Sequence, residues 1–151
     1  FMKTPPSLPL LLATFLAVST SNALSDEGPS QSPKWIWSSA KPAANETAFF
    51  RKEIPVPDDT TKALLLATAD NEISVRVNGT RRAFSSDNWS KPLVENISDQ
   101  ITPGGTLVLG ASAKNAGGIA GALFLIEFTH ENGSKSRVVS DESWIASKRA
   151  V

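Results

Sequence analysis

Residues 67–79 read ATADNEISVRVNG, and this stretch decides the fold class. Between Ile73 and Val77, apolar and polar residues alternate strictly, as in a β-strand with one buried face. Asn78 and Gly79 follow directly and supply the two positive-φ positions of a type I′ turn. The stretch therefore predicts a β-hairpin in which residues 80–84 return as the partner strand. The side chains expected to point inward are Ile73, Val75 and Val77.

The polar cluster Asp70, Asn71 and Glu72 interrupts this stretch just before the hairpin. Asp and Asn side chains hydrogen-bond to nearby backbone amides and favour turns. Turning the chain is therefore the first role expected of the cluster. A ligand site is the alternative, and it ranks below a second candidate further along the chain.

Short strand-like runs separated by Gly, Pro, Asn and Asp continue from Trp35 to the end, and no helix-length stretch occurs among them. The mostly apolar run 61–69 is expected to be a central strand covered on both faces. About eight or nine strands with closely spaced turns predict an all-β protein, a β-sandwich or jelly roll, with a closed barrel as the alternative. The predicted strands are 47–54, 61–69, 73–77, 80–84, 93–97, 106–114, 122–129, 136–140 and 143–147.

The N-terminus has the pattern of a secretory signal peptide over residues 1–23. Lys3 precedes an apolar run, 8–18, that is shorter than the roughly 20 residues a transmembrane helix needs. No membrane span is therefore expected after cleavage. Residues 24–34 are rich in Ser and Pro and predict a flexible linker. Residues 35–151 are then a single β-sandwich domain, expected to be the N-terminal module of a longer protein.

Composition excludes several kinds of partner and site. The chain has 15 Lys and Arg against 15 Asp and Glu, without charge blocks, so it is not expected to bind nucleic acid. It has no cysteine, and therefore no disulfide framework. Together with the signal peptide, this favours a secreted protein or one in the periplasm or envelope of a bacterium. The absence of cysteine and the presence of one histidine also exclude Cys-His and zinc constellations.

Catalysis by this module is not expected. His130 lies beside the turn residues Asn132 and Gly133 and is predicted to be a solvated turn residue, not a catalytic base. Paired carboxylates could cleave a glycosidic bond, but the acidic candidates lie mostly at predicted turns. These candidates are Asp70, Glu72, Asp87, Asp99 and Asp141.

The glycines of AGGIAGALFLIEF match part of a dinucleotide fingerprint, with Gly118 and Gly121 spaced as it requires. That fingerprint needs a following helix, whereas the apolar run 123–128 has the length of a strand. The glycines are instead expected to let two strands approach closely.

Sugar binding is the most plausible ligand chemistry. An aromatic face covers the apolar side of a pyranose, and nearby amides, carboxylates or cations bind its hydroxyls. Trp89, flanked by Asp87, Asn88 and Lys91 in a polar loop, has that composition. Packing of Trp89 into the core is the favoured alternative, since a lone tryptophan in a small β-sandwich usually packs. The remaining tryptophans are expected to be core residues or end-plugs: Trp35, Trp37 and Trp144.

Several pieces of the chain resemble the galactose-binding-like jelly-roll module at the N-terminus of some bacterial α-L-rhamnosidases and other glycoside hydrolases, and at the front of large secreted planctomycete-type proteins. The resemblance covers residues 35–147. The pieces are WIWSS (35–39), AFFRKEI (48–54), ALLLATADNEISVRVNG (63–79), Trp89 ahead of ENISDQITPGGTLVLGASAKNAGG (95–118), AGALFLIEF (120–128) and SDESWIAS (140–147).

The resemblance implies an exported, non-catalytic module that binds carbohydrate or docks against another domain of the same polypeptide. An accessory domain of a secreted glycoside hydrolase, with its catalytic domain outside this fragment, is the alternative; a purely structural interaction domain is another. The candidate carbohydrate site comprises Trp89, Asp87, Asn88, Lys91, Asp70 and Asn71. Such modules often carry a structural calcium ion, for which Asp70, Asn71 and Glu72 could supply oxygens. No other metal or cofactor is expected.

Overall fold

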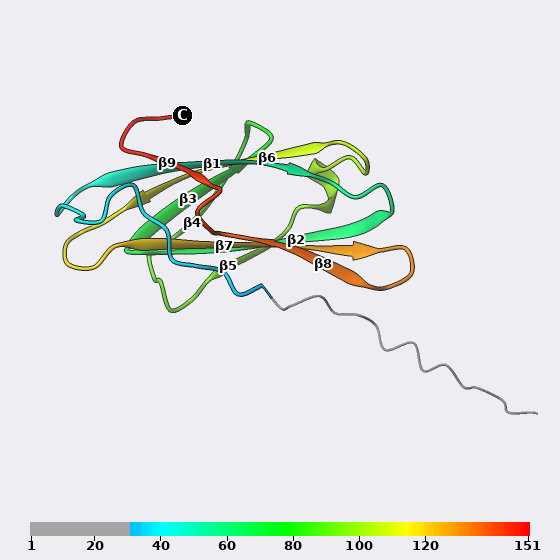
Figure 1. The fold of residues 1–151 in the computed structure, drawn as a ribbon, viewed down its shortest axis with the longest axis horizontal. Helices are drawn as coiled ribbons and strands as arrows, with labels where there is room; N and C mark the ends of the chain where they lie inside the picture. The colour runs from blue at the N-terminus through cyan, green and yellow to red at the C-terminus, as the bar shows by residue number, and fades with distance from the viewer. Residues whose placement is uncertain (1–30) are drawn as a thin grey trace, which may run out of the picture.

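Two antiparallel β-sheets face one another in the computed structural model, which describes residues 31–151 except the side chains of 81–85 (Figure 1). The predicted signal peptide and the first part of the linker lie outside the described residues. One sheet has five strands in the order β4-β3-β6-β1-β9, and the other has four in the order β5-β2-β7-β8. Within residues 31–151, no helix is long and apolar enough to cross a membrane.

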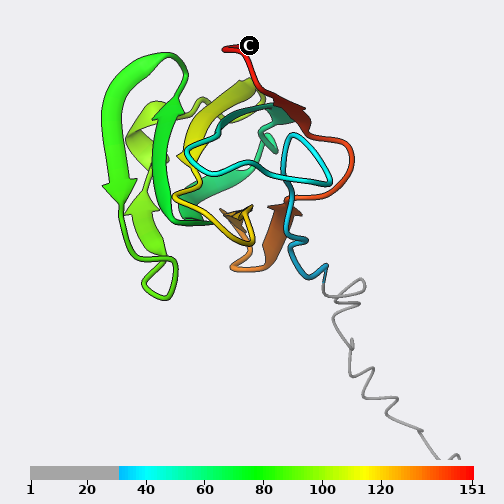
Figure 2. The ribbon, with the colours of Figure 1, turned by 90° about the vertical axis from the view of Figure 1, so that its left-hand side faces the viewer.

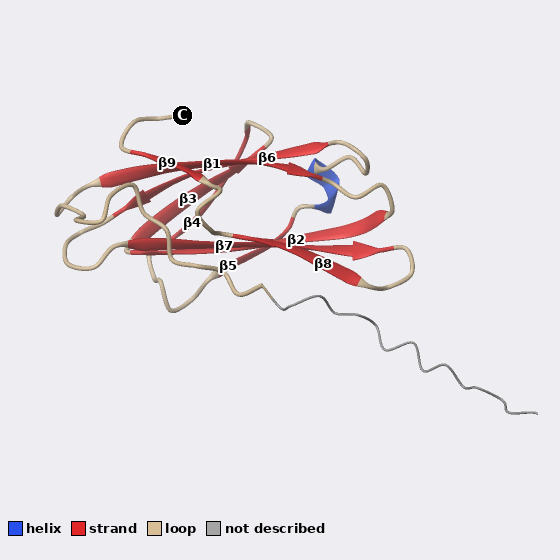
Figure 3. Cartoon of the chain, viewed as in Figure 1, coloured by secondary structure: helices blue, strands red, loops and turns tan. Residues whose placement is uncertain are grey.

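The strands follow the predicted ones to within about two residues, a usual boundary difference. Strands β4 and β9 end one sheet and β5 and β8 end the other, so the sheets do not close into a barrel (Figure 3). The predicted β-sandwich is confirmed, and the barrel alternative is wrong. The elements are β1 (Thr47–Pro55), β2 (Thr60–Asp70), β3 (Glu72–Val77), β4 (Thr80–Ser86), β5 (Leu93–Asn96), the short 3₁₀ helix η1 (Ser98–Gln100), β6 (Thr106–Lys114), β7 (Gly121–His130), β8 (Lys135–Val139) and β9 (Ile145–Ser147).

The predicted hairpin is confirmed as β3 and β4. Asn78 and Gly79 have φ angles of 51° and 71°, and Val77 pairs with Thr80 across the turn. The Asn78 side chain also donates to the Gln100 carbonyl at 2.6 Å. It accepts from the Val108 amide at 2.8 Å, so the turn residue fastens the hairpin to two neighbouring elements. The three residues predicted to point inward, Ile73, Val75 and Val77, are all buried.

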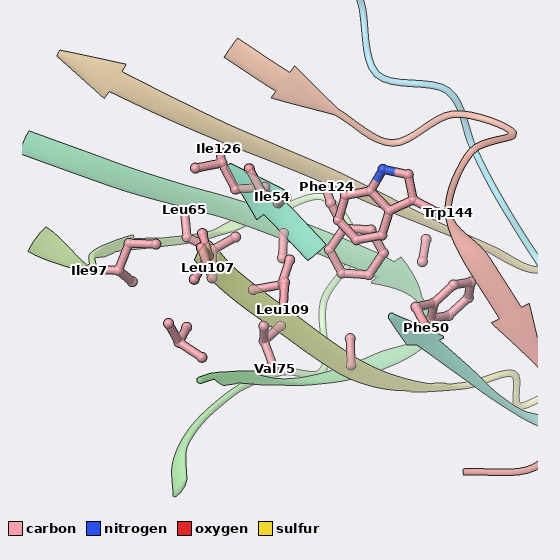
Figure 4. Packing of buried hydrophobic residues seen from close by; sticks show 14 of the residues in the cluster. Phe50, Ile54, Leu65, Val75, Ile97, Leu107, Leu109, Phe124, Ile126 and Trp144 are labelled. Atoms are coloured by element: carbon pink, nitrogen blue, oxygen red, sulfur yellow. The ribbon is translucent and has the colours of Figure 1, made fainter. Parts of the chain in front are cut away.

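The core lies between the sheets and is built from the inward side chains of both (Figure 4). Phe124 stacks on Trp144 with ring centroids 4.7 Å apart, and Phe50 packs against Phe124 at 5.6 Å. The Trp144 indole also donates to the Val139 carbonyl at 2.9 Å. Trp37 is half-buried and contacts Phe50 at 6.0 Å between ring centroids. Trp144 and Trp37 therefore have the roles predicted for them.

Strand β2 is central in its sheet, as predicted, but it is not covered on both faces. Ala63, Leu65 and Ala67 are buried against the opposite sheet, whereas Leu64 and Leu66 on the other face are half-buried. An antiparallel sandwich covers one face of each sheet, in contrast to a parallel sheet layered by helices. The apolar run in the sequence does not distinguish these two arrangements.

Candidate functional site

Three segments meet at the end of the sandwich where β2 finishes: the corner at Asp70–Asn71, the loop 87–92 and the loop 115–120. They lie at the left of Figure 1, and this end faces the viewer in Figure 2. The Thr68 hydroxyl in β2 donates to the Trp89 carbonyl at 2.7 Å, which ties the loop 87–92 to the strand leading into the corner. We call this end of the molecule the rim. The fold thus brings together the two regions predicted as ligand candidates.

The corner carries the chain from one sheet to the other, because β2 belongs to the four-stranded sheet and β3 to the five-stranded sheet. The peptide bond between Asp70 and Asn71 is cis. The Asn71 amide donates to the Lys114 carbonyl at 2.8 Å, and the Asn71 side-chain oxygen accepts from the Ala116 amide at 2.6 Å. Asn71 therefore fixes the loop 115–120 against the corner. This agrees with the turning role that the sequence favours for the cluster.

The loop 87–92 is held by hydrogen bonds of Asn88. The Asn88 side-chain oxygen accepts from the Ser90 amide at 3.0 Å and from its hydroxyl at 2.7 Å. The Asn88 carbonyl accepts from the Lys91 amide at 3.0 Å. The Ser86 hydroxyl lies 3.2 Å from the carbonyl oxygens of both Asn88 and Lys91 and donates to either of them in turn. A short loop with this many internal bonds presents its side chains in a defined arrangement.

Trp89 stands at the tip of this loop with 55% of its surface exposed. The favoured prediction that Trp89 packs into the core is therefore wrong. The loop is attached through the Trp89 carbonyl, which is bonded to Thr68, and this leaves the indole ring outside the core. An exposed aromatic ring on a fastened loop can stack on the apolar face of a ligand.

The remaining predicted site residues point toward different surfaces. Asp87 and Lys91 are exposed, and Asp87 helps to line a hollow of about 300 Å³ together with Glu72 of β3. Asp70, at the last position of β2, pairs with Gly121 of the neighbouring strand β7 in the four-stranded sheet. Asp70 and Glu72 are thus placed on opposite sides of the corner. The predicted set occupies one rim without forming one tight cluster.

Trp35 is a rim residue that the sequence-based prediction misplaced. It is 52% exposed, so it is neither a core residue nor an end-plug. Its ring covers Gly121, where an added Cβ would lie only 2.7 Å from the Trp35 Cε3 atom. Because Gly121 pairs with Asp70, the Trp35 ring lies beside the corner. Gly121, at the start of an apolar strand, is the one signal in the sequence for this contact. The space beside it is occupied by the Trp35 ring and not, as predicted, by a neighbouring strand.

Two scaffold residues at this end escaped the sequence-based prediction. The Glu46 carboxylate accepts from the Ala43 amide, the Trp37 indole and the Ser38 hydroxyl, each at 3.0 Å. Hydrogen bonding from Ala43, followed by that from Ser38, Lys148 and Trp37, lowers the pKa of Glu46 to about 2.

Asn115 is fully buried and links the loops on either side of it. Its side chain donates to the Ala43 carbonyl at 3.0 Å and accepts from the Gly117 amide at 3.0 Å. A buried amide with both ends satisfied stabilises irregular backbone. No periodicity or motif marks this role, so the sequence offered little to find it by.

The residues considered for calcium do not form a closed oxygen cage by themselves. Within residues 31–151, no three His, Cys, Asp or Glu side chains are grouped so that they could hold a metal ion. Glu72 lines the hollow on the five-stranded sheet, away from the Asp70 side of the corner. An ion at Asp70 would need carbonyl and amide oxygens, such as those of Asn71 and the loop 115–120, in addition to the one carboxylate.

His130 is not a solvated turn residue, and that prediction is wrong. Its side chain is 14% exposed and lies at the end of β7, away from the rim. Nδ1 lies 2.7 Å from Asp59 Oδ1 and Nε2 lies 2.9 Å from Ser136 Oγ. The order of these groups matches Ser-His-Asp catalysis, but none of the three lines the hollow beside Asp87 and Glu72. The bonds tie the β7–β8 hairpin to the loop before β2.

Comparison with known proteins gives one curated relative. No protein-family model matches the chain. An α-L-rhamnosidase from Streptomyces avermitilis is 36% identical over an alignment of 131 residues, and the match covers 78% of this chain and 12% of the enzyme. The chain thus spans 12% of the length of the relative it matches.

Solved structures with a similar fold include an enzyme and a lectin. The S. avermitilis α-L-rhamnosidase complexed with L-rhamnose matches with a TM-score of 0.67 and 30% identity, over 78% of this chain and 12% of that chain. A lectin from Pleurotus ostreatus in complex with GalNAc matches with a TM-score of 0.64 and 28% identity, over 76% and 34%. A rhamnosidase from a Bacillus species, 22% identical with a TM-score of 0.63 over 79% and 14%, shares the fold.

Proposed function

We propose that this chain, a galactose-binding-like module of the kind found in α-L-rhamnosidases, binds a carbohydrate at the rim. The resemblance predicted from the sequence is confirmed by the rhamnosidase and lectin matches. In this proposal the module performs no catalysis, and its task is to hold a sugar for a larger protein.

The observation that carries the proposal is the exposed Trp89 ring on a loop fastened to β2. A sugar ring has an apolar face of C–H groups and a polar edge of hydroxyls. Trp89 would cover the apolar face, while Asp87, Lys91 and the free side-chain nitrogen of Asn88 would bind hydroxyls. Asn88 can do this because its internal bonds use its oxygen only.

The corner supplies the second half of the site in this proposal. Asp70 offers a carboxylate that makes no hydrogen bond or ion pair with any described residue. The Asn71 nitrogen is likewise unengaged, because the contact with Ala116 uses the oxygen. A calcium ion at Asp70 would bridge this corner to sugar hydroxyls. Binding with and without EDTA tests for the ion separately from the sugar.

L-rhamnose and GalNAc are the first ligands to try, because they are the sugars in the matched rhamnosidase and lectin structures. Calorimetric titration of the 151-residue chain with each sugar, with and without EDTA, would measure binding and its dependence on calcium. Trp89→Ala should weaken binding about tenfold, equivalent to roughly 1.4 kcal/mol. Ile145→Ala is the matched control, because Ile145 is 54% exposed on β9 and lies outside the rim.

Equal affinities for Trp89→Ala and the unaltered chain would rule out the rim as the sugar site. Absence of binding to either sugar, and to any glycan on an array, would reject carbohydrate binding altogether. An affinity that is insensitive to EDTA would remove calcium from the proposal while leaving the sugar site in place.

We also infer that the module is the exported accessory domain of a glycoside hydrolase. The coverage supports this, because the similar region is a small part of a much longer rhamnosidase. Residues 1–23 would act as the signal peptide. Expression with a secretion system and mass measurement of the exported chain would test the cleavage, which should leave Leu24 as the first residue. An uncleaved chain retained in the cell would contradict it.

A further inference from the structure

Two hollows lie next to one another on the outward face of the five-stranded sheet. Each has a volume of about 300 Å³, and Ser74 of β3 and Ser112 of β6 line both of them. One hollow reaches Asp87 beside the rim. The other extends in the opposite direction to Phe49 of β1 and Arg76 of β3, where Ala150 and Val151 also line it. We call these two neighbouring hollows together the sheet groove.

The strand register explains why the groove is open in the middle. Ser112 faces Ser74 on one neighbouring strand and Phe49 on the other, so small hydroxyl side chains lie beside one aromatic ring. In the next row, Gly110 faces Arg76. A Cβ placed on Gly110 would meet no atom within 4 Å, so this row lies under open space.

The polar side chains around the groove make no interactions with one another. Ser74, Ser112, Glu72, Asp87 and Lys114 form no side-chain hydrogen bond or ion pair with any described residue. Glu72 and Lys114 are directly opposite one another on the neighbouring strands β3 and β6, yet their side chains form no ion pair. On other surfaces some charges are paired, as for Lys34 with Glu142 and Lys135 with Glu127.

The charges that line the groove also balance. Glu72 and Asp87 are acidic, whereas Arg76 and Lys114 are basic. This arrangement offers hydrogen-bond donors and acceptors over its whole length without a strong net field. It suits a neutral ligand rich in hydroxyl groups better than a phosphate, a polyanion or a basic peptide.

We propose that the sheet groove is a second carbohydrate subsite, which takes the continuing residues of a neutral oligosaccharide whose first sugar is held at the rim. Asp87 joins the two sites, since it belongs to the Trp89 loop and also lines the groove. Phe49 provides an aromatic surface for a sugar ring, and the free hydroxyls and charges bind its edges. The proposal rests on the proposed function and extends it from a single sugar to a chain of sugars.

The test compares L-rhamnose with a neutral rhamnotetraose on the 151-residue chain, by calorimetry. The tetrasaccharide should bind about tenfold more tightly than the monosaccharide, a gain that the second subsite supplies. Ser112→Gln fills the point where the two hollows meet, and it should abolish the gain while leaving the affinity for L-rhamnose unchanged. Thr106→Gln is the matched control, because Thr106 is an exposed residue of the same strand outside the groove.

An NMR measurement on the unaltered chain keeps the test independent of the folding of the variant. The amide signals of Ser74, Gly110 and Ser112 should shift with rhamnotetraose and stay unchanged with L-rhamnose. A Trp89→Ala chain that no longer binds L-rhamnose can be tested in the same way. If rhamnotetraose still shifts these signals, the groove binds sugar even though the rim does not.

Three results would overturn the subsite. The first is equal affinity for the two sugars, and the second is a gain that survives Ser112→Gln. The third is a dimer, detected by light scattering, that Ser112→Gln dissociates, because a second copy of the chain would then occupy the groove.

Discussion

The hydroxyl of Thr68 donates a hydrogen bond to the carbonyl of Trp89, and this 2.7 Å contact joins a strand of the core to the loop that carries the exposed indole. Thr68 is 6% exposed, so the donor end of this bond is buried. The position of the Trp89 ring thus depends on a residue that no ligand would touch.

Replacing Thr68 with valine should weaken sugar binding without removing any ligand contact. Valine keeps the shape of the side chain but loses the donor, so the loop loses its attachment to β2. Unfolding by urea should show a loss of about 1 kcal/mol, the usual net contribution of such a bond. Thr61→Val is the control, since Thr61 makes a similar bond to the Thr129 carbonyl at an exposed position. Unchanged affinity in Thr68→Val would show that the loop holds its shape alone.

Glu46 predicts a particular dependence of stability on pH. Its pKa is lowered from 4.5 to about 2 in the folded chain, so the ionised form is the one that folding favours. The stabilisation is fully present above about pH 4.5 and is lost as the pH falls toward about 2. Glu46→Gln should therefore be less stable than the unaltered chain at pH 7, and the difference should shrink at pH 3. Urea unfolding at both values measures it, with Glu53→Gln as an exposed control; a difference independent of pH would contradict the role of the charge.

The contact between His130 and Asp59 predicts a shifted carboxyl titration. The hydrogen bond from His130 is the largest cause that lowers the pKa of Asp59. His130→Gln should raise that pKa toward the ordinary value, which carboxyl ¹³C shifts would record. The Asp59 pKa is lower in the folded chain than in the unfolded chain, so ionised Asp59 stabilises the fold at pH values above its unfolded pKa. The unaltered chain should lose this stabilisation as the pH falls through the folded pKa. Sugar binding should not change, since His130 lies away from the rim; a loss of binding would contradict this separation.

Gly121 and Gly110 should respond in opposite ways to alanine. In Gly121→Ala the new Cβ would lie 2.7 Å from Trp35 Cε3, so the ring must move. Overpacking of this kind costs about 1–3 kcal/mol, and the tryptophan fluorescence should change. Gly110→Ala has open space around the new atom and should be neutral or slightly stabilising. Similar stabilities for the two variants would show that Trp35 does not rest on Gly121.

The architecture could be predicted from the sequence because its evidence is local. The alternation between Ile73 and Val77, with Asn78 and Gly79 after it, fixes a hairpin without reference to the rest of the chain. The exposure of Trp89 depends instead on where its carbonyl finds a donor, and that donor lies 21 residues earlier. The local sequence around Trp89 does not show such a distant hydrogen bond.

The histidine shows the same limit for a single side chain. His130 is next to turn residues in the sequence, but its partner Asp59 is 71 residues away. Gly121 has no side chain, and the sequence shows this. The group that occupies the space is the Trp35 indole, 86 positions earlier, which lies there because Ile36 bridges to Ala122. Both corrections come from contacts made after the sheets have assembled.

The corner at Asp70–Asn71 has a mechanical consequence. Because β2 and β3 lie in different sheets, this short connection transmits force from one layer of the sandwich to the other. A sugar that spans Asp70 on one layer and Asp87 beside the other would brace the two layers against sliding. Bound chains would then resist pulling at the rim more strongly than free ones.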